Sequence, residues 1–149
     1  MRTSTLELCD GLIRYRADSS PVWEMPIADA RVIGEMTNDH GPLLDDYFIC
    51  FATDANIWYE ASFYADGRDE FLKSMGAFLG CELPLSLAGS TDFQSNVLWP
   101  PHLAGKPMFR FIPKRPKAWL CRLLGLSSNI QCFTDEVLSE LKSQGQADR

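Results

Sequence analysis

The sequence contains little of what zinc sites and histidine-dependent catalysis require. Only two histidines are present, His40 and His102, and they lie far apart in the chain with neither HxxxH nor HxH spacing. His40 lies near Asp39, Asp45 and Asp46 in an acidic loop, which we interpret as a solvated loop. We therefore expect no metal site.

Motifs for phosphate binding and for nucleophilic catalysis are absent as well. GxxxxGK[ST], GxGxxG and GxSxG do not occur in the sequence, which excludes nucleotide binding by those loops and a serine elbow. The adjacent acids Asp45-Asp46 and Asp69-Glu70 precede a predicted strand and open a predicted helix, so each pair has a structural explanation. We expect no cofactor and no enzymatic activity.

The cysteines do not form a recognisable framework. They are odd in number, and no two of them form a CxxC pair; they are Cys9, Cys50, Cys81, Cys121 and Cys132. Four of them lie in or beside apolar runs, which is typical of reduced thiols used as small core residues. A disulfide or metal framework is the alternative, and a Cys81–His102 dyad has no local support.

Long apolar runs are also missing. None approaches the roughly 20 residues that a membrane-spanning helix needs. The first residues, "MRTSTLELCDG", contain one arginine and no apolar stretch of the kind that secretory signals carry. These features favour a cytoplasmic protein.

Charge is unevenly distributed along the chain. The net charge is −6, and residues 1–100 contain 16 acids and 6 bases, whereas residues 101–149 contain 4 acids and 8 bases. The acidic first part argues against a general nucleic-acid binder. The basic segment near residues 106–122 is the electrostatic feature most suited to selecting a partner.

Short strand patterns fill the first half of the chain. "LELCDGLIRYR" indicates a hairpin that turns at Asp10-Gly11. "VWEMPI" indicates a short strand in which Pro26 marks either a sheet edge or a bulge, and "ARVIGEM" a further strand with a bulge at Gly34. "DYFICFAT" is apolar on both faces, which predicts a central, covered strand.

The stretch "IWYEASFYA" predicts the strand that returns from this central strand. Ile57, Tyr59, Ala61 and Phe63 alternate with Trp58, Glu60, Ser62 and Tyr64, and the polar members make the second set the expected solvent face. Most aromatic residues between 54 and 80 are explained by core packing. Trp58 and Tyr64 remain as candidates for a binding surface.

A helix is expected after this strand. Asp66 is the expected N-cap, Asp69 and Glu70 occupy the first turn, and Gly80 ends the helix. The apolar positions follow the spacing of a core-facing helix; they are Phe71, Leu72, Met75, Phe78 and Leu79. Gly76 weakens the helix and is expected to allow close packing on the sheet.

The chain after Gly80 is irregular as far as Pro101 and then contains further elements. Short strands are expected at Val97–Trp99 and within "KPMFRFIPK". "KRPKAWLCRLLGL" predicts a basic amphipathic helix, and "TDEVLSELKSQ" a final helix capped by Thr134. We expect a single α+β domain over residues 1–113 and a helical extension over 114–149 packed on it.

The basic helix has three possible roles. Its leucine stripe can pack on the body, it can form a partner interface, or it can lie on an anionic membrane surface. Its candidate partner-binding residues are Lys114, Arg115, Lys117, Trp119 and Arg122.

The pattern of antiparallel strands closed by one amphipathic helix resembles the pleckstrin-homology-like (PH-like) fold. "LIRYRADSSPVWEMPIADARVIGEM" followed by "DDYFICFATDANIWYEASFYADGRDEFL" resembles small bacterial proteins of that type, many of unknown function, over about residues 5–80. The resemblance implies a partly closed barrel that more often binds than catalyses. Lipid-binding members carry a cluster of bases near the first strand, where only Arg14 and Arg16 match here, so phosphoinositide binding is not carried over.

Together these patterns predict a mostly antiparallel α+β protein that acts as a non-catalytic protein-binding or adaptor module. An immunity-type neutraliser of a toxic basic enzyme is the first alternative, because the acid excess suits such a partner. A peripheral membrane protein that uses the basic helix of residues 114–124 is the second. The sequence does not identify a partner or an oligomeric state.

Overall fold

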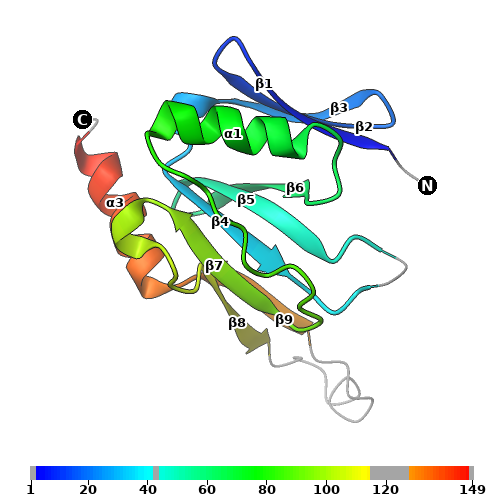
Figure 1. The fold of residues 1–149 in the computed structure, drawn as a ribbon. Coiled ribbons are helices and arrows are strands. Elements are labelled where there is room, and N and C mark those ends of the chain that lie inside the picture. Colours follow the sequence, from blue (N-terminus) through cyan, green and yellow to red (C-terminus); the bar gives the residue numbers. More distant parts are fainter. Residues whose placement is uncertain (1–2, 42–43, 115–127, 148–149) are drawn as a thin grey trace.

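The computed structural model describes residues 3–41, 44–114 and 128–147 (Figure 1). Sheet A is a meander of β1 (Ser4–Cys9), β2 (Leu12–Ala17) and β3 (Ser20–Pro26). Sheet B has the order β6 (Ile57–Ser62), β5 (Tyr47–Asp54), β4 (Val32–Thr37), β7 (Gln94–Trp99). A ribbon pairs β8 (Phe109–Lys114) with β9 (Ser128–Phe133). The helices are α1 (Arg68–Leu79) and α3 (Asp135–Ala147), with 3-10 turns η1 (Ile27–Asp29) and η2 (Pro101–Leu103).

The predicted α+β class with mainly antiparallel strands is confirmed, and the described strands do not form a closed barrel. All named strand pairs are antiparallel, and the described strands form three sheets that do not close on one another. Between sheets A and B, the indole Nε1 of Trp23 on β3 donates to the carbonyl oxygen of Glu60 on β6 at 2.8 Å. A closed barrel would need a ladder of backbone hydrogen bonds between the two sheets. Here a side chain, not a backbone amide, binds that β6 carbonyl.

The first turn of sheet A follows the sequence prediction. Asp10 and Gly11 both have positive φ, 53° and 75°, as a tight two-residue hairpin requires. Asp18 and Ser19 repeat this arrangement with φ of 49° and 67°. β3 is an edge strand that ends at Pro26, so of the two alternatives predicted from that proline the sheet edge is confirmed.

A first hydrophobic core lies between sheet A, α1 and one face of sheet B (Figure 1). Sheet B contributes Ile49 and Phe51 from β5, and α1 contributes Phe71 and Met75. The alternate β5 residues, such as Cys50, face the opposite side, and burial raises the pKa of the Cys50 thiol. The prediction of β5 as a central strand covered on both faces is confirmed.

A second core covers the other face of sheet B and shows that the solvent face predicted for β6 is wrong. Trp58 packs against Phe109 of β8 and Phe133 of β9, with ring centroids 5.3 and 5.2 Å apart. Val137 and Leu141 of α3 complete this cover. This face of β6 carries polar residues, yet β8, β9 and α3, which follow more than 40 residues later in the chain, cover the face.

The start of α1 differs from the prediction. Gly67, in the left-handed conformation at φ 80°, is the N-cap, and no side chain caps the helix. Asp66 instead joins sheet A through its backbone, which exchanges hydrogen bonds of 2.8 and 2.9 Å with Ser4 and Leu6. The acids Asp69 and Glu70 in the first turn and the left-handed Gly80 at the end agree with the sequence.

Two glycines allow close approaches. A Cβ atom on Gly76 would lie 2.7 Å from the carbonyl oxygen of Cys81, so this glycine makes room for the chain leaving α1 and not, as predicted, for the sheet. Gly34 lies at the predicted irregularity in β4, where the register with β7 shifts, and a Cβ there would lie 2.8 Å from the Asn96 carbonyl oxygen.

The C-terminal part is not wholly helical. Residues 128–133, inside the predicted helical extension, form β9, and Lys114, predicted to start the basic helix, is the last residue of β8. The rest of that predicted helix, including Arg115, Lys117, Trp119 and Arg122, lies outside the described residues. The final helix is confirmed as α3. Thr134 was predicted to cap this helix, and its side-chain hydroxyl donates to the Pro107 carbonyl at 3.0 Å.

A contact between His102 of η2 and Glu140 of α3 predicts an acid-sensitive contribution to stability. Glu140 accepts from Gln144 Nε2 at 2.6 Å and lies 2.8 Å from His102 Nε2, and these two contacts lower the pKa of Glu140 from its usual 4.5. A carboxyl whose pKa is depressed by folding stabilises the fold above its unfolded pKa, and this stabilisation is lost as the pH falls through the folded value.

We expect Glu140→Gln to cost about 0.5 kcal/mol of unfolding free energy at pH 7, a small cost because solvent screens the pair. The difference from the parent protein should shrink as the pH falls from 7 to an acid value below the lowered pKa of Glu140. Urea unfolding at both pH values measures it. A difference that stays constant between the two pH values would contradict the assignment, and Glu136→Gln on the exposed side of α3 is the matched control.

Candidate functional site

Four strand ends meet at one edge of sheet B. Because neighbouring strands are antiparallel in the order β6-β5-β4-β7, the ends of β6 and β4 lie beside the starts of β5 and β7. Strands lie about 4.8 Å apart, so the four ends span about 15 Å. The segments leaving this edge contain exposed aromatic and acidic residues.

Hydrogen bonds tie these segments together. The Tyr64 hydroxyl, just past β6, donates to Asp46 Oδ1 at 2.8 Å, and the Asp46 carbonyl accepts from Asn38 N at 2.8 Å. On the other side of β4, Thr37 Oγ1 donates to the Asp92 carbonyl at 2.7 Å. Residues 38–41, 44–46, 63–64 and 92–93 therefore lie side by side at this edge. We name it the strand-end surface, made of Asp39, His40, Leu44, Asp45, Asp46, Tyr64, Asp92 and Phe93.

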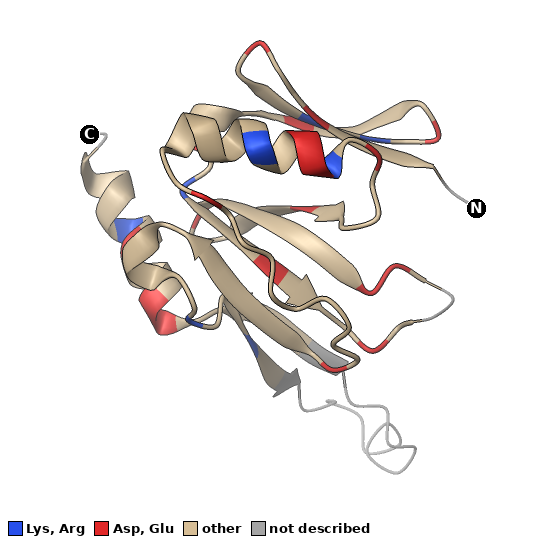
Figure 2. Ribbon diagram, viewed as in Figure 1, with Lys and Arg blue, Asp and Glu red and all other residues tan. Residues whose placement is uncertain are grey.

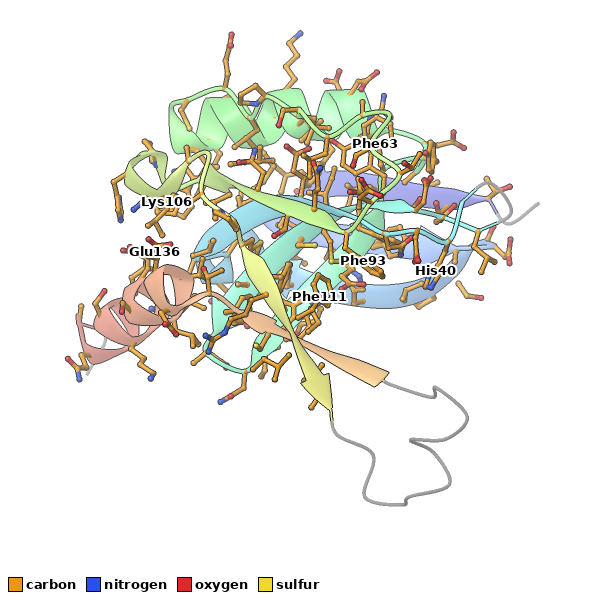
Figure 3. All side chains as sticks on the ribbon, turned by 90° about the horizontal axis from the view of Figure 1, so that it is seen from below. His40, Phe63, Phe93, Lys106, Phe111 and Glu136 are labelled. Carbon is orange, nitrogen blue, oxygen red and sulfur yellow. The ribbon has the colours of Figure 1, made fainter. Side chains whose placement is uncertain are left out.

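Large apolar side chains are exposed on this surface. Leu44 is 68% exposed, Tyr64 58% and Phe93 45%. Phe93 contacts Phe111 of β8, with ring centroids 4.8 Å apart. Figure 3 shows Phe93 and His40 toward one end of the molecule, with Phe63 near them and the Lys106–Glu136 pair at the opposite end. Exposed apolar groups that gather in this way are typical of interaction sites.

Phe63 supports the strand-end surface through contacts of its aromatic ring. Its ring stacks on Tyr47 at 4.2 Å between centroids and 14° between planes. The guanidinium of Arg68 lies 4.0 Å from the centroid of the same ring, and Tyr64 meets its edge at 5.3 Å. These contacts fix the backbone that carries Tyr64.

The loop segments of the strand-end surface are acidic, although the Arg68 guanidinium lies against Phe63 beside them. Segments 37–47, 62–65 and 84–96 contain Asp39, Asp45, Asp46 and Asp92 and neither lysine nor arginine. Figure 2 shows these acids in red on the loops at the lower right. The hydrogen bond to Asp46 is the main cause that raises the pKa of Tyr64, so its hydroxyl stays protonated and keeps donating at neutral pH.

A fully buried carboxylate, Glu35 of β4, lies behind this surface. Its Oε1 accepts from Ser86 N at 3.0 Å, Ser86 Oγ at 2.8 Å and Asn96 Nδ2 at 3.0 Å. Its Oε2 accepts from the Tyr47 hydroxyl and from Leu87 N. Burial, followed by the hydrogen bond to Glu35, raises the pKa of Tyr47.

Glu35 therefore holds the elements that carry the strand-end surface. Tyr47 directly follows Asp46 and supports the Phe63 ring, while Ser86 and Leu87 begin the segment that reaches Phe93. The sequence analysis does not single out Glu35, because it treats this residue only as one position of a predicted strand. An acid between Gly34 and Met36 in an apolar strand was the available signal, since a buried charge must be hydrogen-bonded.

The candidate residues from the sequence are not brought together. Trp58 is half-buried in the second core, and its Nε1 donates to Glu60 Oε1 at 2.9 Å. Tyr64 is exposed on the strand-end surface, whereas Trp58 lies near the opposite end of β6. Lys114 ends β8, and the other four candidates, Arg115, Lys117, Trp119 and Arg122, lie outside the described residues.

Hollows lie elsewhere on the described surface. One of about 490 Å³ runs beside α1 and is lined mainly by Leu72, Ala77, Cys81, Leu83 and Pro84. Another of about 380 Å³ lies between the end of β3 and the β5–β6 turn and contains Glu24, Asp29, Arg31 and Asp54. Neither touches the strand-end surface.

Within residues 3–41, 44–114 and 128–147, no group of three or more His, Cys, Asp or Glu side chains is placed to hold a metal ion. Over the same ranges, no helix combines the length and apolar character needed to cross a bilayer. The four cysteines of the described part are free thiols.

Comparison of the chain with protein-family models, curated proteins and solved structures finds no match.

Proposed function

We propose that this chain is a non-catalytic module that binds another protein through the strand-end surface. The observation that carries the proposal is the exposure of Leu44, Tyr64 and Phe93 on one surface whose loops are tied together by hydrogen bonds. Rigid aromatic and aliphatic side chains surrounded by polar groups are typical centres of protein interfaces.

The binding energy is expected to depend on the exposed apolar side chains. The double substitution Leu44→Ser with Phe93→Ser should weaken binding at least about tenfold, because a few central residues carry most of an interface's energy. The measurement is crosslinked capture of partners from lysate of the source cells, followed by titration of the protein recovered with the parent chain.

The double variant Val22→Ser with Phe78→Ser is the matched control. These side chains are 54% and 60% exposed but lie on β3 and α1, away from the strand-end surface. It should bind as the parent chain does. Equal losses in the two variants, or a loss in neither, would contradict this use of the surface.

Neutralisation of a basic toxic enzyme is the second candidate function. The 16 acids against 6 bases of residues 1–100 favour it, since charge complementarity speeds association. Such a partner should bind with an association rate that falls steeply as salt rises and should lose its activity in the complex.

The PH-like relationship of residues 5–80, and with it a bacterial and cytoplasmic origin, belongs to the same proposal. Strands β1–β3 and strands β4–β6 each form an antiparallel meander, and α1 follows them. The PH-like resemblance rests on this order of elements, so the order supports the proposal. Superposition of an experimental structure on PH-like domains tests it.

A further inference from the structure

We propose that the strand-end surface recognises arginine side chains on a basic protein, an inference that rests on the proposed function. The surface combines exposed rings with exposed carboxylates. Arginine suits this combination best, because its planar guanidinium hydrogen-bonds to a carboxylate in its plane and stacks on a ring with its face.

The charge of the surface selects a cation. Asp39, Asp45 and Asp92 are exposed, and Asp46 is half-buried beneath Tyr64. The four strand ends span about 15 Å, which is about two Debye lengths at physiological salt, so a ligand is attracted mainly by the acids nearest to it. The segments that carry them contain neither lysine nor arginine, and the Arg68 guanidinium beside them is paired with Asp69.

The arrangement of Tyr64 and Asp46 favours arginine over lysine. The tyrosine hydroxyl donates to Asp46 Oδ1 at 2.8 Å, which holds a ring that is 58% exposed next to a carboxylate. A guanidinium over this ring gains a cation–π contact and has acids within reach. An ammonium is more strongly hydrated and has no flat face with which to stack.

A guanidinium that stacks on an aromatic ring is already present within the chain, next to the strand-end surface. The guanidinium of Arg68 lies 4.0 Å over the Phe63 ring, its Nη1 donates to the Phe63 carbonyl at 2.8 Å, and its Nη2 pairs with Asp69 at 2.8 Å. Tyr64, the next residue along the chain, presents a ring without such a cation in the described contacts. A partner's arginine would repeat on Tyr64 what Arg68 does on Phe63.

The exposed apolar residues complete the recognition. Leu44 and Phe93 offer surface to the aliphatic stems of arginine side chains, which bury their methylene groups while the charged head remains near acids. Phe93 is held against Phe111, so it presents a fixed ring edge.

The first experiment uses defined probes on the full chain. A peptide of alternating arginine and glycine is titrated into 15N-labelled protein, beside matched lysine–glycine and citrulline–glycine peptides. We expect the arginine peptide to shift amides of residues 38–41, 44–46, 63–64 and 92–93, and to bind about fivefold more tightly than the lysine peptide. The neutral citrulline peptide should not bind. Equal affinity for arginine and lysine, or shifts spread over the whole chain, would overturn the proposal.

Variants test the location. Asp39→Asn with Asp45→Asn should weaken the arginine peptide about tenfold, and Tyr64→Leu should remove its preference over lysine. The control, Glu7→Gln with Asp10→Asn, removes exposed acids of sheet A and should change affinity by less than about twofold. A control that loses as much as the Asp39/Asp45 variant would show only non-specific attraction to an acidic chain.

The two proposals fail separately. If the arginine peptide shows no preference but the Leu44/Phe93 variant still loses its captured protein, the surface binds proteins and the arginine inference alone is wrong. If the peptide behaves as expected but that variant captures its partner normally, the proposed function at this surface is wrong.

Discussion

Replacing Glu35 with alanine is expected to lower the free energy of unfolding by about 3–5 kcal/mol. The donors around its two oxygens come from Tyr47, Ser86, Leu87 and Asn96, and Glu35 itself is fully buried. Removal of the carboxylate leaves these donors without an acceptor, and each unsatisfied buried group costs about 1–3 kcal/mol where water cannot replace it. Urea unfolding followed by tryptophan fluorescence measures the change.

The loss should also be visible as local opening. The amides of Ser86 and Leu87 donate to Glu35, so hydrogen exchange of the segment that they begin should accelerate more than that of β5. Glu35→Gln keeps the size of the side chain and one oxygen, and should cost about 1–2 kcal/mol. The control Glu70→Ala removes an exposed acid from α1 and should cost less than about 0.5 kcal/mol.

A Glu35→Ala variant that loses no more than the Glu70→Ala control would show that the network adds nothing to stability. If Glu35→Ala unfolds the chain entirely, the glutamine variant still provides the comparison. In the folded glutamine variant, the arginine peptide should bind more weakly than in the parent, because Glu35 holds Tyr47 and the 86–87 backbone behind the strand-end surface.

Phe51→Ala is expected to cost about 3–5 kcal/mol of unfolding free energy. Phe51 is fully buried in the first core, where its ring meets the Trp23 ring at 5.7 Å and the Phe71 ring at 5.8 Å. Sheet A, sheet B and α1 therefore meet at one side chain. Its removal leaves a cavity that the three elements cannot all close, and urea unfolding measures the cost.

Phe78 provides a control of the same residue type. It lies on α1 and is 60% exposed, so Phe78→Ala should change stability by less than about 0.5 kcal/mol. Equal effects of the two substitutions would mean that the three elements do not depend on one shared core.

Local sequence patterns were sufficient for the individual elements of residues 4–80. The Asp10-Gly11 turn, the two-sided apolar pattern of β5 and the glycine that ends α1 each reflect rules that act within a few residues. For the same reason the errors were local as well. Asp66 has the chemistry of an N-cap, but its backbone is drawn into contact with Ser4 and Leu6, which no local rule can foresee.

The sequence by itself determined the α+β class and the acidic character. Tertiary structure alone decided that Trp58 is covered by Phe109 and Phe133, that Glu35 is buried among its donors, and that four strand ends bring Asp46 and Phe93 to one edge. The physical reason is distance along the chain. Strand order and the packing of β8, β9 and α3 join residues tens of positions apart, whereas hydrophobic periodicity reports only the neighbours of each residue.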